Sequence, residues 1–254
     1  MPAPDTRIAR VVAIGASNLT RGLQTIVATA RTTWGPDVEI VAALGHGRSY
    51  GTASAFLVRR LPGILDSGLW RSLEDAPRVP TRALVTDVGN DILYGFPAAR
   101  ILGWVDDALA RLAQMTDDIV LTGLPMDSIR RLSPRLFLAA RTVLAPSCRL
   151  SQTAVTSTAE EVQAGLERLA AARGVRFVPL QPSWYGLDPI HIRPALWPQA
   201  WQEILGASCD LGSSRLEALR LYAMRPQRQW LCGIEQRAPQ RGVRLTRGGR
   251  VWLY

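Results

Sequence analysis

The sequence contains no lysine, so all 30 of its basic residues are arginine, against 21 acidic residues. Histidine is also scarce, with two residues in 254, and there are only three cysteines. Cys148, Cys209 and Cys232 are scattered and lack the spacing of metal ligands. Because no cluster of histidine and cysteine exists, we expect no structural zinc site and no cofactor.

Long apolar runs are absent as well. None approaches the roughly 18 residues that a membrane-spanning helix needs. The first ten residues, MPAPDTRIAR, contain no apolar stretch of the kind found in secretory signals. We therefore expect a soluble, cytoplasmic protein without a transmembrane segment. At 254 residues and 47% hydrophobic content, the chain is long enough for one sizeable core.

Short apolar runs alternate with helical patterns over the first two hundred residues. Runs that are apolar at nearly every position predict strands buried on both faces, at 9–15, 38–44, 82–88, 118–124 and 175–180. Apolar spacing and capping signals predict helices over 98–115, 133–144, 157–174 and 194–207. This alternation predicts an α/β fold with a central parallel sheet covered by helices on both faces.

Two of the helix predictions depend on particular end signals. For 157–174, Ser157 and Glu160 have the spacing of a capping box, and Gly174 is a stop signal. For 194–207, Pro198 predicts an irregular first turn.

The last 45 residues depart from the alternating pattern. Residues 210–254 hold nine arginines against three acids. A short helix is predicted over 215–224, and the run 243–254 predicts two strands joined at Gly248 and Gly249. We expect one main domain over residues 1–208 and an Arg-rich arm over 209–254 that is too small for a core of its own.

Three interpretations of the arm stay open. It is a solvated surface, a contact between copies of the chain through the apolar run VWLY, or a binding surface for nucleic acid or an anionic membrane. Nucleic-acid binding is not expected, because no recognised motif accompanies the charge.

Polar and glycine residues follow four of the five predicted strands. Ser17 follows the first strand, GHGRSYG (45–51) the second, Gly-Asn-Asp (89–91) the third, and a loop with Asp188 and His191 the fifth. Ligands of parallel sheets bind at the carboxyl ends of strands, so these residues are expected to meet at one edge.

These residue types together suit acyl transfer. A serine hydroxyl becomes a good nucleophile when a base removes its proton, and histidine suits this role because its pKa lies near neutrality. A carboxylate orients the imidazole and stabilises its charged form. Backbone amides and an amide side chain are suitable donors for the oxyanion of a tetrahedral intermediate.

At this point the sequence resembles the SGNH/GDSL hydrolases. Four blocks, IGASNL, GHGRS, VGND and DPIH, occur in the order of that family and span roughly residues 9 to 206. The resemblance implies a flavodoxin-like three-layer α/β/α sandwich and hydrolysis of an ester or thioester through an acyl-enzyme. It implies a small-molecule or acylated substrate and does not fix its identity.

The resemblance also implies roles for individual residues. Ser17 corresponds to the nucleophile, His191 to the base and Asp188 to the partner of the base. The oxyanion donors correspond to the amides of Ser17 and Gly47 and the side chain of Asn90. Residues 1–208 are thus expected to form an SGNH-hydrolase-like catalytic domain.

The first block departs from the family. It has Gly-Ala-Ser where the family usually has Gly-Asp-Ser. Ala16 cannot supply the hydrogen bonds that an aspartate makes around the nucleophile turn. The G-x-S-x-G elbow of the α/β-hydrolases is also absent, because Leu19 stands in place of the second glycine.

Alternatives remain for several of these assignments. Taken alone, Ser17 is a candidate helix cap, which is the commoner role of a serine between a strand and a helix. Gly47 is preferred to Gly45 as oxyanion donor because the run GRS matches the family block better. His46 is expected to be a wall residue, and Asp91 a structural residue that ties down the Asn90 loop.

Two aromatic residues near the blocks, Tyr94 and Trp184, are candidates for lining an acyl or sugar pocket; the alternative is that they complete the core. At the level of function, two alternatives to a hydrolase remain. One is a non-catalytic binding or scaffold protein of the same fold, and the other is an O-acyltransferase that uses the same site.

Overall fold

A computed structural model describes residues 9–144, 148–207, 215–246 and 248–254. The amino-terminal run on which the signal-peptide expectation rests lies almost entirely outside these ranges. The proposed boundary at 208/209 and Cys209 lie outside them too. Among the described helices, none combines the length and the apolar content that crossing a bilayer requires.

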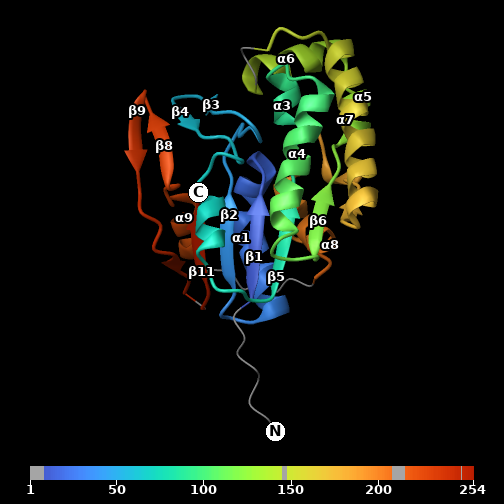
Figure 1. Cartoon of the computed structure of the whole chain (residues 1–254). Coiled ribbons are helices and arrows are strands. Elements are labelled where there is room, and N and C mark those ends of the chain that lie inside the picture. Colours follow the sequence, from blue (N-terminus) through green and yellow to red (C-terminus); the bar gives the residue numbers. More distant parts are fainter. Residues whose placement is uncertain (1–8, 145–147, 208–214, 247) are drawn as a thin grey trace.

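The five predicted strands lie next to one another, all parallel, in a seven-stranded sheet with the order β10-β11-β2-β1-β5-β6-β7 (Figure 1). They are β1 (Arg10–Ile14), β2 (Glu39–Ala43), β5 (Thr81–Val85), β6 (Ile119–Thr122) and β7 (Arg176–Val178). Taken in chain order, these five strands are arranged second, first, third, fourth, fifth. That is the flavodoxin-like order, so the α/β prediction is confirmed.

Helices cover both faces of the sheet (Figure 1). The helices packed on one face are α2 (Leu69–Glu74), α4 (Ala98–Leu112) and α7 (Gln152–Arg173). Those on the other face are α1 (Ser17–Trp34), α8 (Trp197–Leu205) and α9 (Arg215–Tyr222). The remaining helical elements lie in the segments between these strands and helices. They are α3 (Asn90–Leu93), α5 (Met126–Arg130), α6 (Pro134–Leu144) and the 3₁₀ turns Pro182–Trp184 and Pro194–Leu196.

The predicted capping box at Ser157 is wrong. Helix α7 begins at Gln152, and the Ser151 hydroxyl accepts a hydrogen bond from the Ala154 amide at 3.1 Å, which makes Ser151 the cap. Ser157 lies inside the helix, because the apolar stripe that the core buries starts earlier, at Val155. The predicted stop at Gly174 is confirmed by its left-handed backbone, with φ of 64°.

The helix predicted over 194–207 is present, and its start is irregular, as Pro198 predicts. A 3₁₀ turn, Pro194–Leu196, precedes the regular turns of α8. The short carboxyl-terminal helix is also present, as α9.

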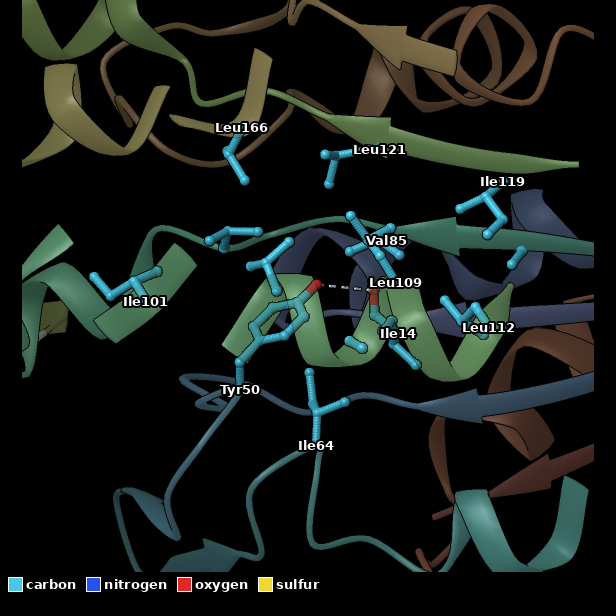
Figure 2. Close-up of a cluster of buried hydrophobic side chains, with 14 of the residues drawn as sticks. Ile14, Tyr50, Ile64, Val85, Ile101, Leu109, Leu112, Ile119, Leu121 and Leu166 are labelled. Carbon is cyan, nitrogen blue, oxygen red and sulfur yellow. Dashed lines mark hydrogen bonds between the residues drawn. The ribbon is translucent and has the colours of Figure 1, made fainter. Parts of the chain in front are cut away.

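The strands are buried on both faces, as their continuous apolar runs predict. In β1, Val12 and Ile14 pack toward α4, while Val11 and Ala13 pack toward α1 and α8. Figure 2 shows the first of these layers, where Ile14 lies between the strands and the α4 side chains. Tyr50 is fully buried in this layer, and its hydroxyl donates to the Thr86 carbonyl at 2.7 Å.

The carboxyl-terminal arm joins both sheets of the protein. Strand β8 (Arg228–Leu231) pairs with β4 (Arg59–Leu61) in a four-stranded antiparallel sheet with the order β3-β4-β8-β9, whose other members are β3 (Ser54–Phe56) and β9 (Ile234–Arg237). The predicted hairpin is confirmed, because β10 (Val243–Arg244) runs antiparallel to β11 (Arg250–Leu253).

Strand β11 also extends the central sheet, pairing in parallel with β2. Its Val251 is fully buried and Leu253 is 4% exposed. The apolar run that suggested a contact between copies is therefore used within the chain, which corrects the premise of that interpretation. The association state itself stays a prediction.

Candidate active site

The strand ends bring three of the four sequence blocks to one edge of the sheet. Ile14 of β1 is paired with Ala43 of β2 on one side and with Val85 of β5 on the other. The chain therefore leaves these strands at the same level, at the upper end of the sheet in Figure 1. The order of the strands reverses between β1 and β5, so Ser17 and Asn90 follow the two strands that flank the switch point.

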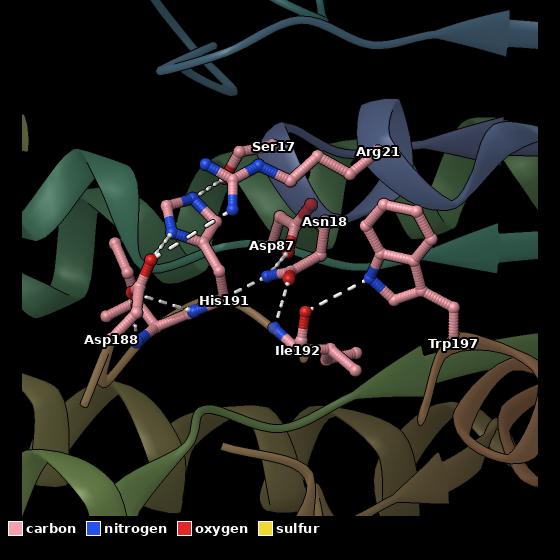
Figure 3. Close-up of polar contacts among 9 residues, drawn as sticks. Ser17, Asn18, Arg21, Asp87, Asp188, His191, Ile192 and Trp197 are labelled. Atoms are coloured by element: carbon pink, nitrogen blue, oxygen red, sulfur yellow. Dashed lines mark hydrogen bonds and ion pairs between the residues drawn. The ribbon is translucent and has the colours of Figure 1, made fainter. Parts of the chain in front are cut away.

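Ser17, His191 and Asp188 form a continuous chain of polar contacts (Figure 3). His191 Nε2 lies 2.9 Å from Ser17 Oγ, and His191 Nδ1 lies 2.7 Å from Asp188 Oδ2. Both distances are within hydrogen-bond reach, so the imidazole is placed to take the Ser17 proton while Asp188 holds its other nitrogen. Ser17 is 8% exposed and His191 is 5% exposed. The hydroxyl and the imidazole are thus largely shielded from water, while Asp188 remains half-exposed.

The Asp188 carboxylate also fixes the backbone of the loop that holds Asp188 and His191. Asp188 Oδ1 accepts hydrogen bonds from the amides of Ile190 and His191, each at 3.2 Å, which is an Asx-type turn. Burial acts to raise the pKa of Asp188, but the hydrogen bond and charge of His191 and the two amides outweigh it, so the pKa is lowered. The carboxylate that faces Nδ1 is therefore held in its ionised form.

Asn18, which the sequence analysis did not single out, ties this loop to the start of α1. Its Nδ2 donates to the Ile190 carbonyl and to Asp87 Oδ1, both at 2.9 Å, and its Oδ1 accepts from the Ile192 amide at 2.9 Å (Figure 3). Trp197 fixes the same loop from α8, because its Nε1 donates to the Ile192 carbonyl at 3.0 Å. The only sequence signal for Asn18 is its position next to Ser17 at the opening of a helix.

Asp87 is a second residue that the sequence analysis missed. It follows β5 and has φ of 60°, a conformation that is uncommon for residues other than glycine. Its Oδ2 accepts from the amides of Ala16 and Leu19, both at 3.0 Å. A carboxylate from β5 thus contacts the turn between β1 and α1, where Ala16 has no polar side chain.

Gly47 and Asn90 lie in neighbouring loops. The Asn90 side chain donates to the Arg48 carbonyl at 3.3 Å, and the Tyr94 hydroxyl donates to the Gly47 carbonyl. Gly47 has φ of 64°, and a Cβ there would lie 2.9 Å from the Tyr94 hydroxyl, so a larger residue is disfavoured. Gly45, the alternative donor, is buried and has its carbonyl bonded to the Arg48 amide.

A largely apolar cavity of about 110 Å³ opens beside Ser17. Its polar end has Ser17, Asn18, Asp87 and Asn90. Its apolar end is formed by side chains of α3, α5, α6 and α7 and the segments between them, including Leu93, Ile129, Leu132, Phe137, Val155 and Ala159.

The two aromatic residues expected to line a pocket lie elsewhere. Trp184 is 1% exposed and belongs to the core between α1 and α8, and it is not among the cavity residues. Tyr94 lies against Gly47 rather than in the cavity. Tyr185, the neighbour of Trp184, lines the cavity instead.

His46 lies near the site but outside the contacts of His191. It is half-buried, and its ring centroid lies 5.5 Å from that of Phe56. Burial lowers the pKa of His46, and the charges of Arg21, His191 and Arg59 lower it further. Arg21, which lies one turn after Ser17 on α1, has its Nη1 4.0 Å from Asp188 Oδ2 (Figure 3).

The Asp91 carboxylate links the segment of Asn90 to the segment 45–51. It is fully buried, and its Oδ2 accepts a hydrogen bond from the Tyr50 amide at 2.9 Å. Burial raises the pKa of Asp91 to about 6, although hydrogen bonds from Ser49 and Tyr50 act in the opposite direction. This geometry fits the structural role expected for Asp91.

The raised pKa predicts a pH-dependent contribution to stability. Folding favours protonated Asp91, so its contribution is fully present below about pH 4 and is lost as the pH rises through about 6. The free energy of unfolding of the parent relative to Asp91→Asn should fall by about 2–3 kcal/mol between pH 4 and pH 7. Urea titrations of both proteins across this range measure it, and a difference that stays constant contradicts it.

Comparison with known proteins gives distant structural matches and no match in sequence. No family model matches the sequence, and no curated protein sequence matches it. Among solved structures, the chain is similar to TesA, with a TM-score of 0.48 and 16% identity over 78% of this chain and 96% of that one. It is also similar to the psychrotrophic esterase EstA from Pseudoalteromonas sp., with a TM-score of 0.44 and 12% identity over 78% of this chain and 95% of that one.

Proposed function

We propose that the protein is a serine hydrolase that cleaves a carboxylic ester or thioester through an acyl-enzyme. The observation that carries this proposal is the contact of His191 Nε2 with Ser17 Oγ at 2.9 Å, backed by Asp188 at 2.7 Å from Nδ1. Ser17, at the start of α1, and His191, in a loop, lie 174 residues apart in the sequence. Their order, acid to imidazole to hydroxyl, is that of a nucleophilic triad.

In the proposed reaction, Ser17 Oγ attacks the carbonyl carbon of the substrate and its proton passes to His191 Nε2. Ionised Asp188 accepts from Nδ1 and stabilises the imidazolium. The bond from carbon to the leaving oxygen or sulfur then breaks, and His191 gives its proton to that atom. Water repeats the sequence on the acyl-enzyme, releasing the acid and restoring the Ser17 hydroxyl.

The oxyanion that forms in each step needs donors. The Ser17 amide at the start of α1, the Gly47 amide and the Asn90 side chain are the proposed donors. Asn90 supports this role because it lines the same cavity as Ser17.

The cavity favours an apolar acyl group. Its far end is lined mainly by aliphatic side chains and Phe137. Its volume of about 110 Å³ is smaller than the ~150 Å³ of an apolar cavity that holds benzene, so we propose an acyl chain of about four to six carbons.

The proposal is tested with p-nitrophenyl butyrate and hexanoate, and with a butyryl thioester. The purified protein should hydrolyse the aryl esters, the thioester or both. It should hydrolyse p-nitrophenyl hexanoate faster than p-nitrophenyl acetate, which is assayed for comparison. Turnover no faster than in buffer with every substrate would contradict the proposal and favour a binding or scaffold protein.

The proposed oxyanion donor predicts a further result. Replacing Asn90 by alanine should lower kcat for the aryl ester by about 100- to 1000-fold, because one donor to the transition state is lost. KM should change little, because the ground-state carbonyl is weakly bonded. A loss smaller than threefold, with unchanged thermal unfolding, would remove Asn90 from the mechanism.

A further inference from the structure

We propose that Asp87 is a positioning residue, which caps α1 from another strand and, through Asn18, holds the loop of His191 against Ser17. This inference rests on the proposed function. Among the described residues, Asp87 makes no hydrogen bond to Ser17 Oγ or to the His191 ring. It accepts hydrogen bonds from the amides of Ala16 and Leu19 and from Asn18 Nδ2, and Figure 3 shows the last of these.

The first part of the role is the cap. Helix α1 has Ala16 at its N-cap, no side-chain cap from that position and no acidic residue in its first turn. A cap side chain normally accepts from the third residue of the helix. Here Asp87 Oδ2 accepts from that residue, Leu19, and also from Ala16. The carboxylate also places negative charge at the positive end of the helix dipole.

The second part is the orientation of Asn18. An ionised carboxylate only accepts hydrogen bonds, so the Asn18 group that faces Asp87 Oδ1 is the NH₂. With Nδ2 on that side, Oδ1 is directed to the Ile192 amide, and Nδ2 also reaches the Ile190 carbonyl. Two backbone groups on either side of His191 are therefore fixed by an amide whose orientation Asp87 sets.

The backbone conformation of Asp87 indicates that its contacts hold this residue in place. A φ of 60° is disfavoured for residues with a Cβ, and such a conformation persists when the surrounding contacts require it. The adjacent residue is fixed as well, because the Thr86 amide donates to the Ile14 carbonyl at 3.0 Å. The turns after β1 and β5 are thus locked to each other.

Replacing Asp87 by asparagine separates the cap on α1 from the orientation of Asn18. In Asp87→Asn, the side-chain oxygen still accepts from Ala16 and Leu19, and asparagine tolerates this φ. Its NH₂ then faces the NH₂ of Asn18, so the orientation of Asn18 is lost while the cap stays. Asp66→Asn, an exposed site, makes the same change of charge and serves as the control.

The experiment measures the second-order rate of labelling by a fluorophosphonate, which reports the reactivity of Ser17 without knowledge of the natural substrate. Asp87→Asn and Asn18→Ala should each label about 10- to 100-fold more slowly, because small displacements of reacting groups cost up to about 100-fold. The double variant should be no slower than the slower single variant, because both act through one contact. With p-nitrophenyl butyrate the loss should fall on kcat, with KM within about twofold.

The outcomes are distinct. Labelling of Asp87→Asn or of Asn18→Ala within twofold of the parent overturns the proposal, as do effects that multiply in the double variant. Equal slowing in Asp66→Asn overturns it too, because charge alone then explains the result. If the parent protein is not labelled at Ser17 at all, the proposed function fails and this inference fails with it.

Discussion

Replacing Ser17 by alanine is expected to lower kcat/KM for p-nitrophenyl butyrate by about 10⁴- to 10⁶-fold. The acyl-enzyme cannot form without the hydroxyl, and only oxyanion stabilisation and binding remain to assist attack by water. The fold should persist, because alanine is well tolerated in the first turn of a helix. Initial rates together with thermal unfolding measure both effects.

Ser157→Ala is the matched control for this substitution. Ser157 is exposed on α7 and is not one of the residues that line the cavity, and its replacement makes the same chemical change. Its activity should stay within twofold of the parent. If Ser17→Ala retains more than about a tenth of the parent activity, Ser17 is not the nucleophile.

The second large effect is expected at His191, and the two histidines of the chain form a natural pair for comparison. Replacing His191 by glutamine should lower kcat/KM by about 10⁴- to 10⁶-fold, because His191 Nε2 is the group that contacts Ser17 Oγ, and in the described part of the chain no second base bonds to that hydroxyl. Replacing His46 by glutamine should cost less than about tenfold, since its ring packs against Phe56 and, among the described residues, it makes no hydrogen bond to Ser17, Asp188 or His191.

Rates for both variants across pH 5 to 9 complete this test. In His191→Gln, the remaining activity should lose the pH dependence that the parent shows over this range, because the general base has been removed. The result that would contradict the assignment is the reverse ranking, with His46→Gln the more damaged variant.

The strands of the central sheet and the helices α4, α6, α7, α8 and α9 were predictable because their apolar patterns report burial directly. The strands of the antiparallel sheet, β3, β4, β8 and β9, were not predicted, because they are short and most of their residues are exposed or only partly buried. Each run that is apolar at nearly every position became a strand of the central sheet, as with 9–15 and β1. The start of α7 was missed because Ser151 and Ser157 are both acceptable caps, and only the packing of Val155 decides between them.

The candidate site was predictable to the extent that its residues follow strands. Register and strand order then bring Ser17 and Asn90 to one edge. Asp87 and Asn18 were not predictable, because their roles depend on a positive φ and on contacts between loops. The departure at Ala16 marked a missing carboxylate, but nothing in the sequence indicated that a residue 71 positions away contacts the same turn.

Trp184 illustrates a further limit of sequence reasoning. Adjacent aromatic residues, Trp184 and Tyr185, follow the same strand, and a turn directs one into the core and the other toward the cavity. The sequence does not specify which one, because both are large and apolar. The carboxyl-terminal arm is a similar case. Its apolar run VWLY suggested a contact between copies of the chain, but in the structure it forms β11, which pairs with β2 of the same chain.

The most direct test of the central claim is to locate a phosphonate adduct by mass spectrometry. Trypsin cleaves after Arg10 and Arg21, so Ser17 lies in the peptide 11–21. After treatment with a fluorophosphonate, we expect one adduct, on Ser17, which is absent in His191→Gln. An adduct on a different residue, or loss of ester hydrolysis while Ser17 stays unmodified, would show that Ser17 is not the nucleophile.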